Sequence, residues 1–309
     1  LMSALRRLCL VVEDWLQSEQ PNSEYTELLQ SYFDWLRFLR ISESFDRHYR
    51  CLLIQRPQGV GLKLYNINPG PNLAVAMARL TSVVGFSATL MPQRYFQTLM
   101  GIGEKASWFQ IDSPFAAANL GVFATSYIST TYRDRADSLY ELVDSIAVIV
   151  AQRFGNYLVV LPSFAYLNEV RDKLIERHPG VTHVSQMPGM DEVARSNFLG
   201  RFKGGVDGEE PTTLVGFAVM GGIFGEAIDL KGSRLIGVII AGVGLPQIGV
   251  ERDLIKAYFE QPEQAGQGFE FAYQYPAMSR VLQTAGRGIR GEQERGIICL
   301  IDNRFNEAR

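Results

Sequence analysis

The sequence predicts an α/β protein whose larger part is a doubly wound parallel sheet, preceded by a helical segment. Three observations support this fold class. From Leu120 onward, short apolar runs typical of buried strands alternate with amphipathic stretches typical of helices. Residues 1–46 instead carry two apolar stripes at helical spacing. The 309 residues, 47% hydrophobic and 20% charged, suffice for one large or two modest domains with a sizeable core.

Composition excludes several classes of protein. The longest apolar runs, such as residues 235–241, are far shorter than the ~20 residues of a membrane-spanning helix, and no signal segment opens the chain. Cys9, Cys51 and Cys299 are far apart, which argues against a disulfide framework or a zinc site and fits a reducing cytoplasm. The net charge of −3 gives no general attraction to nucleic acid, so DNA contact requires a local patch. Because the chain opens on Leu1 and ends without a tail, we expect a piece of a longer protein.

The first third of the chain combines helices with a short hairpin. We expect two helices within residues 1–46, separated by the turn SEQPNS, in which Asn22 or Ser23 caps the second helix. The elements expected further on are strands at 49–55 and 61–66, a helix at 74–80, a short buried strand at 82–86, a helix at 93–100 and an inter-domain linker at 108–119.

The remaining chain alternates strand and helix, which is typical of a parallel sheet with right-handed crossovers. The strands are expected near 121–127, 156–161, 181–185, 213–219, 235–240 and 296–301. The helices are expected near 136–154, 163–177, 191–203, 250–260 and 271–286. Asp191 opens one of these helices and follows no buried strand, so we interpret it as a helix cap rather than a magnesium-binding carboxylate.

Two arginines lie in a glycine-rich break between the last predicted helix and the last predicted strand. Arg287 and Arg290 are three residues apart, among Gly286, Gly288 and Gly291. A guanidinium group is always charged and its planar fork matches phosphate oxygens, so the pair can clamp an anion. Taken alone, the pair is explained more simply by interaction with the negative end of the helix dipole. The glycines also spell G-x-G-x-x-G, but they follow a helix and precede a strand, the wrong order for a dinucleotide-binding turn.

Four segments in a fixed order carry a family resemblance. Q-x-x-G-R-x-x-R at 283–290, followed by an apolar strand ending in D-x-R, resembles motif VI of superfamily-two helicases in the form of the DinG/XPD branch. S-A-T at 87–89 resembles motif III, and P-S-F at 162–164 resembles motif IV. Residues 221–232 resemble motif V, in which Ala227 replaces the usual glycine.

The resemblance implies the C-terminal half of an ATP-dependent DNA helicase with RecA-like motor domains. Residues 1–46 would end an insertion domain, residues 47–119 would end the first motor domain and form the linker, and residues 120–309 would form the second motor domain. ATP and Mg²⁺ would be bound mainly by the first motor domain, because this sequence has no G-x-x-x-x-G-K-[S/T] phosphate loop. Cysteine ligands of any iron–sulfur cluster would also lie outside this chain. We therefore expect the chain alone to hydrolyse no ATP.

The resemblance also assigns roles to single residues. The implied catalytic residues are Arg287 and Arg290, as arginine fingers, and Gln283, which positions the nucleotide side of the cleft. The implied nucleotide-binding residues are Gly225, Glu226, Asp229 and Gly286. The implied nucleic-acid-binding residues are Ser163, Ser87 and Thr89. Because ligands bind where parallel strands end, we expect Ser163, residues 225–229 and Arg287 near one edge or face of the sheet. Capping of the helix that follows could alone explain Ser163.

The partners implied are single-stranded or forked DNA and the N-terminal motor domain of the same protein, in the cytoplasm at the nucleoid and without a membrane. A competing interpretation is a non-enzymatic RecA-like module that binds nucleic acid or protein and keeps motif VI for packing. A small-molecule α/β enzyme is a third interpretation, but His48, His178 and His183 form no evident nucleophile–base arrangement.

Overall fold

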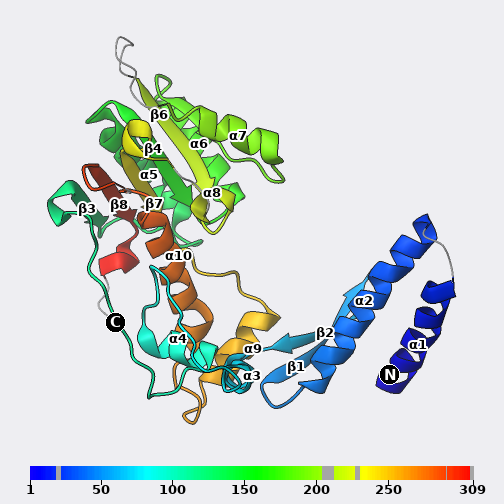
Figure 1. The fold of residues 1–309 in the computed structure, drawn as a ribbon. Coiled ribbons are helices and arrows are strands. Elements are labelled where there is room, and N and C mark those ends of the chain that lie inside the picture. The colour runs from blue at the N-terminus through cyan, green and yellow to red at the C-terminus, as the bar shows by residue number, and fades with distance from the viewer. Residues whose placement is uncertain (19–21, 204–211, 227–229, 290, 307–309) are drawn as a thin grey trace. The chain divides into compact units, whose positions relative to one another are not determined.

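The computed structural model describes residues 1–18, 22–203, 212–226, 230–289 and 291–306, with only the backbone of residues 225 and 226. Contacts divide the chain into two compact units (Figure 1). The N-terminal unit comprises Leu1–Gly85, Pro92–Ala106 and Gly249–Gly268. The sheet unit comprises Phe86–Met91, Ser107–Ile248 and Phe269–Arg309. The domain boundaries expected from the sequence stay a prediction.

The N-terminal unit begins with a helical pair and a hairpin, as predicted. Helices α1 (Met2–Ser18) and α2 (Ser23–Glu43) pack on each other, and the hairpin strands β1 (Tyr49–Arg56) and β2 (Gly59–Asn66) are antiparallel. The side-chain oxygen of Asn22 accepts a hydrogen bond from the backbone N–H of Tyr25 at 2.8 Å, which confirms the predicted cap of α2. None of the helices in the described ranges is long and apolar enough to cross a bilayer.

Two short helices of the N-terminal unit meet at a pair of glycines. Helices α3 (Gly70–Met77) and α4 (Gln93–Met100) come so close that a Cβ on Gly70 would lie 2.0 Å from the carbonyl oxygen of Thr98. Gly101, which ends α4, has φ +65° and would clash in the same way with the backbone of Gly70. Both positions therefore require glycine, one for space and one for space and backbone conformation.

One predicted element of this region is wrong. Residues 82–86 form no strand, and Val84 and Phe86 are 84% and 93% exposed. A buried strand needs a neighbouring strand to pair its backbone, and the described residues provide none for this segment. The helix expected at 74–80 is present as α3 but begins earlier, because Pro71 suits its first turn.

Residues 249–268 are distant in sequence from the rest of the N-terminal unit but are anchored to it by side chains. The hydroxyl of Tyr258 in α9 (Val250–Phe259) lies 2.5 Å from Nδ1 of the buried His48 and 3.5 Å from Nδ2 of Asn68. Lys63 of β2 pairs with Glu251 at 2.5 Å. The helix α9 thus makes an exposed polar contact with β2 and a buried polar contact with the residues that flank the hairpin.

The sheet unit contains six parallel strands in the order β3-β8-β7-β4-β6-β5. Their bounds are β3 (Leu120–Thr125), β4 (Gly155–Leu161), β5 (Thr182–Ser185), β6 (Thr213–Val219), β7 (Gly237–Ala241) and β8 (Gly296–Ile301). All six strands predicted from Leu120 onward are therefore confirmed. Every residue of the central strand β4 after Gly155 is buried, as expected for a strand covered on both faces.

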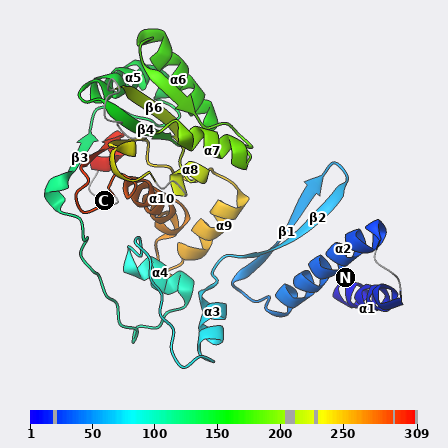
Figure 2. The same cartoon turned by 45° about the horizontal axis from the view of Figure 1, so that its top comes forward.

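Helices cover both faces of this sheet (Figure 2). On one face, α5 (Arg135–Ala151) and α6 (Phe164–Arg177) pack against alternate strand residues such as Val159 and Phe217. On the other, α7 (Glu192–Gly200), α8 (Ile223–Glu226) and α10 (Tyr275–Ala285) pack against residues such as Leu158 and Val160. A π-helical turn, Glu270–Gln274, precedes α10, and short 3₁₀ turns occupy Ala117–Asn119, Gly232–Arg234 and Asn303–Asn306. Asp191 caps α7 through the N–H of Ala194, as predicted.

The buried hydroxyl of Tyr258 yields a first prediction. In Tyr258→Phe the ring nitrogen of His48 loses its partner in a buried site, which should cost about 1–3 kcal/mol of stability. Amide hydrogen exchange in α9 should accelerate, since local opening exposes those amides. The matched control is Tyr65→Phe in the same unit, whose hydroxyl makes no hydrogen bond among the described residues. Equal exchange rates in the two variants would show that the contact does not hold α9.

Candidate functional site at the carboxyl edge of the sheet

Ser163 lies at the carboxyl edge of the sheet, two residues after β4 ends. Its hydroxyl oxygen accepts a hydrogen bond from the backbone N–H of Tyr166 at 3.3 Å and caps α6. The structural role expected for Ser163 is therefore confirmed, while its role in binding nucleic acid stays a prediction. Ser87 and Thr89 form a local exposed turn, in which the N–H of Thr89 donates to the Ser87 hydroxyl at 3.3 Å.

The glycine-rich turn after α10 packs against the start of the last strand. A Cβ on Gly296 would lie 2.3 Å from the carbonyl oxygen of Gly288, so the turn approaches β8 as closely as backbone permits. Gln283 is exposed and Arg287 is half-buried in this region. Gly286 forms the C-cap of α10.

The structure does not bring Arg287 to the edge where Ser163 lies, and the sequence expectation is wrong for this pair. The turn beside Arg287 contacts the first residue of β8, at the amino ends of the strands, whereas Ser163 follows the carboxyl end of β4. A helix that leads into a parallel strand ends beside the amino end of that strand. Arg290, Asp229 and the side chain of Glu226 lie outside the described residues, as does any side-chain geometry around Gly225.

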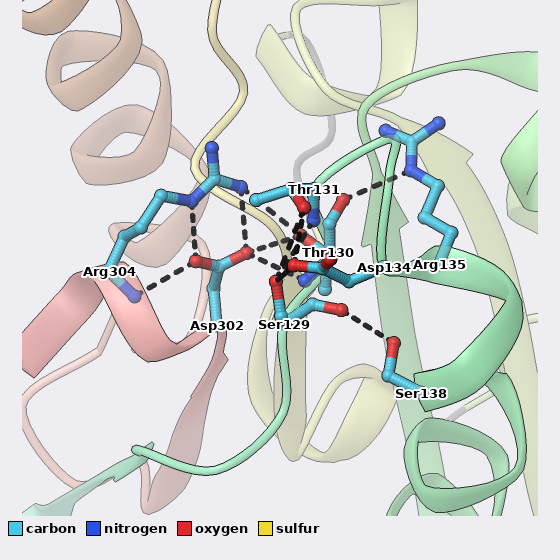
Figure 3. Close-up of polar contacts among 8 residues, drawn as sticks. All are labelled: Ser129, Thr130, Thr131, Asp134, Arg135, Ser138, Asp302 and Arg304. Carbon is cyan, nitrogen blue, oxygen red and sulfur yellow. Dashed lines mark hydrogen bonds and ion pairs between the residues drawn. The ribbon is translucent and has the colours of Figure 1, made fainter.

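Polar side chains from two loops meet at the carboxyl edge beside β3 and β8 (Figure 3). Asp302 directly follows β8 and is 0% exposed. Its carboxylate accepts hydrogen bonds from Arg304 Nε at 2.6 Å, from Arg304 Nη2 at 2.8 Å, from the N–H of Thr130 at 3.2 Å and from the Thr130 hydroxyl. Burial alone would raise the pKa of Asp302, but hydrogen bonds from Arg304 and Thr130 outweigh it and hold the pKa below its ordinary value. The buried carboxylate therefore stays ionised.

A second carboxylate fixes the loop between β3 and α5. Asp134 accepts hydrogen bonds from the hydroxyls of Ser129 and Thr131, both at 2.7 Å. These two hydrogen bonds lower the pKa of Asp134. Ser138 of α5 donates to the carbonyl of Ser129 at 2.5 Å. The loop from Ser129 to Asp134 is thus held at both of its ends.

Arg135, the first residue of α5, is oriented by this loop. Its Nε donates to the carbonyl of Thr130 at 3.0 Å, and its guanidinium carbon lies 4.2 Å from the centroid of the Tyr166 ring. Tyr166 is buried in the first turn of α6, and burial raises its pKa to about 12. Thr130 therefore contacts both Asp302 and Arg135, so that it joins the buried carboxylate to a fixed guanidinium.

This arrangement presents oriented donors that can bind an anionic group. Within the described ranges, no group of three or more His, Cys, Asp and Glu side chains could hold a metal ion. What the edge offers is a rigid loop and two oriented guanidinium groups. Sequence reasoning missed Thr130, Asp134 and Arg135. The available signal was S-T-T-x-x-D between a predicted strand and a predicted helix, a pattern of local hydroxyl–carboxylate hydrogen bonds.

The buried ion pair yields a prediction with a defined pH dependence. The pKa of Asp302 is lower in the folded than in the unfolded protein, so its contribution is fully present above the ordinary Asp value near ~3.9 and is lost as pH falls through the folded value. Asp302→Asn should therefore lower the free energy of unfolding by roughly 3–5 kcal/mol near neutral pH. The variant leaves the charge of Arg304 without its partner and removes part of the hydrogen bonding of Thr130. The cost should shrink in acid. Asp172→Asn, at an exposed pair with Arg171, is the control and should change stability by less than about 1 kcal/mol.

Denaturant unfolding of both variants at neutral and acid pH measures this difference. A loss for Asp302→Asn that is as large in acid as at neutral pH would contradict the ionised, stabilising carboxylate.

Comparison with known proteins gives the relatives of this chain. The curated "ATP-dependent DNA helicase XPD" of Sulfolobus acidocaldarius is 24% identical over 237 residues, which cover 72% of this chain and 39% of the relative. The "ATP-dependent DNA helicase DinG" of Photobacterium profundum is 27% identical over 236 residues, covering 74% of this chain and 32% of the relative. The chain thus spans well under half the length of these two relatives.

Solved structures agree on the fold. The structure named "XPD_APO" has a TM-score of 0.62 at 17% identity, and the match covers 93% of this chain and 59% of the chain in that structure. The structure named "XPD_Helicase" has a TM-score of 0.60 at 17% identity, and the match covers 98% of this chain and 58% of the chain in that structure. The six-stranded parallel sheet with helices on both faces is therefore an α/β fold of the RecA-like type. The family described as "Helicase C-terminal domain" matches residues 146–309, more than half of the 309 residues, and the chain belongs to this family, in the XPD/DinG type of helicase.

Proposed function

We propose that this chain is the C-terminal half of an ATP-dependent DNA helicase that couples ATP hydrolysis to translocation along single-stranded DNA. The observation that supports this most is the position of the helicase-like segments. Those resembling motifs IV, V and VI all lie within the family match at 146–309, and their described residues directly follow or precede strands of one RecA-like sheet. The two relatives described above are named ATP-dependent DNA helicases, and this chain covers less than half of each.

In this proposal ATP and Mg²⁺ are bound mainly by the N-terminal motor domain of the same protein. Arg287 and Arg290 enter the nucleotide site as arginine fingers and stabilise the charge of the transferred phosphoryl group. Gln283 positions the nucleotide side of the cleft, and Gly286 lets the backbone approach it. The close packing of Gly288 on Gly296 supports this role for Arg287, because a guanidinium on fixed backbone needs little reorganisation during the reaction.

The opposite end of the sheet holds the DNA strand in this proposal. Ser163 keeps a hydroxyl proton for a phosphate oxygen while its oxygen caps α6. Ser87 and Thr89 add polar contacts, and Gly225, Glu226 and Asp229 link the nucleotide state to the grip on DNA. The substrate is single-stranded or forked DNA, and the whole protein acts in the cytoplasm at the nucleoid. A non-enzymatic binding module of the same fold would keep both arginines for packing only.

The arginine fingers are tested in the full-length protein. Arg287→Ala should lower kcat of the DNA-stimulated ATPase by roughly 10³–10⁵-fold. Arg287→Lys should rescue little, because a point charge cannot reproduce the planar fork. DNA binding without nucleotide should change little. The control is Arg201→Ala, which removes an exposed arginine just after α7 of the same unit and should leave kcat unchanged.

Thermal stability measured on the same variants separates a finger from a packing residue. A destabilised Arg287→Ala protein with near-normal kcat per folded molecule would end the finger assignment. A full-length wild-type protein that binds DNA but has no ATPase activity would instead favour the binding module.

A further inference from the structure

Arg135 carries a positive charge that pairs with no carboxylate among the described residues. Its Nε donates to the Thr130 carbonyl, and its guanidinium stacks on Tyr166. Figure 3 shows the two terminal nitrogens pointing away from this contact, without an interaction to the other residues drawn. Four directional N–H donors of one fixed guanidinium thus remain for a ligand.

Several contacts fix this guanidinium before any ligand arrives. Thr130, which binds Nε, is itself held by the buried Asp302 through both its N–H and its hydroxyl. Tyr166 is 1% exposed and supports the guanidinium face at 4.2 Å. Partial burial of a cation without a counter-charge is unfavourable because water is removed from it. An anionic ligand would offset that cost and would meet a group whose orientation is already set.

The position selects a phosphate as that anion. Tyr166 belongs to the first turn of α6, a helix of 14 residues, so the stacked guanidinium lies beside the positive end of a helix dipole. The carboxyl edge of a parallel sheet is where such folds bind ligands. A planar fork with parallel N–H donors matches two oxygens of one phosphate group.

We propose that Arg135 binds a backbone phosphate of the single-stranded nucleic acid, with Thr130 and Tyr166 as the residues that position it. This inference rests on the proposed function and adds a specific contact to it. The site is built from contacts within the sheet unit alone. Arg133 lies in the same loop but is exposed and makes no side-chain hydrogen bond or ion pair within the described ranges, so it serves as the matched control.

The experiment measures equilibrium binding of the full-length protein to a labelled oligo(dT) strand, without nucleotide, over a series of salt concentrations. Arg135→Ala should weaken binding roughly tenfold at moderate salt, as expected for lost charged hydrogen bonds. It should also reduce the slope of log K against log salt by about 0.7, the value for one phosphate of a single strand. Arg133→Ala should keep the wild-type slope.

Three further variants keep the test independent of folding. Tyr166→Phe retains the ring and removes a hydroxyl that is buried without a hydrogen bond in the described structure, so it should bind as wild type. Tyr166→Leu fills much of the same volume but removes the stacking surface and should weaken binding. Arg135→Lys should keep the slope of log K against log salt, because the charge remains. It should bind DNA more weakly, because lysine lacks the planar fork of the guanidinium.

The outcomes distinguish the sources of phosphate and the two proposals. Affinity of Arg135→Ala for a fluorescent ATP analogue should equal that of wild type. Lower nucleotide affinity with an unchanged DNA salt slope would overturn the strand contact in favour of a nucleotide phosphate. If Arg135→Ala and Arg133→Ala both bind DNA with the affinity and the salt slope of the wild-type protein, the inference is overturned and the proposed function stands. Absence of DNA binding by the wild-type protein would overturn both.

Discussion

The buried carboxylate of Asp302 is the contact on which the carboxyl edge of this sheet depends. It joins the end of β8 to the loop after β3, over a separation of 172 residues. A buried charge is costly unless several donors compensate it, and here Arg304 and Thr130 together supply five hydrogen bonds, one of them from the backbone N–H of Arg304. Because Thr130 is fixed in this way, its carbonyl can orient Arg135, and the edge presents a preorganised guanidinium at the start of α5.

The strand β8 has a functional candidate at each of its ends. The turn that carries Arg287 packs on Gly296, its first residue, and Asp302 follows Ile301, its last. Six residues of strand separate the two by about 20 Å. Under the proposed function, one short, mostly buried strand therefore connects the nucleotide side of the sheet with the side that holds the DNA strand. A rigid connection of this kind suits a motor in which two sites must respond together.

Much of the fold could be predicted from the sequence because its signals are local. The six strands are short apolar runs between turn residues, and the caps Asn22, Ser163 and Asp191 each bond to a backbone N–H three residues ahead. Contacts between distant residues left no such signal. The pairing of Asp302 with Thr130 and the anchoring of α9 through Tyr258 depend on the tertiary fold. The segment 82–86 has the apolar composition of a strand, but its state depends on neighbours that the described residues do not supply.

Under the proposed function, this chain is one half of an ATP-driven motor whose phosphate-binding half lies elsewhere in the protein. Steady-state ATPase activity of residues 1–309 and of the full-length protein, each with and without single-stranded DNA, tests it most directly. The account predicts turnover by the full-length protein that DNA stimulates, and none above background by residues 1–309, whose sequence has no phosphate-binding loop. Turnover by residues 1–309 alone, with contaminating ATPase excluded, would contradict it.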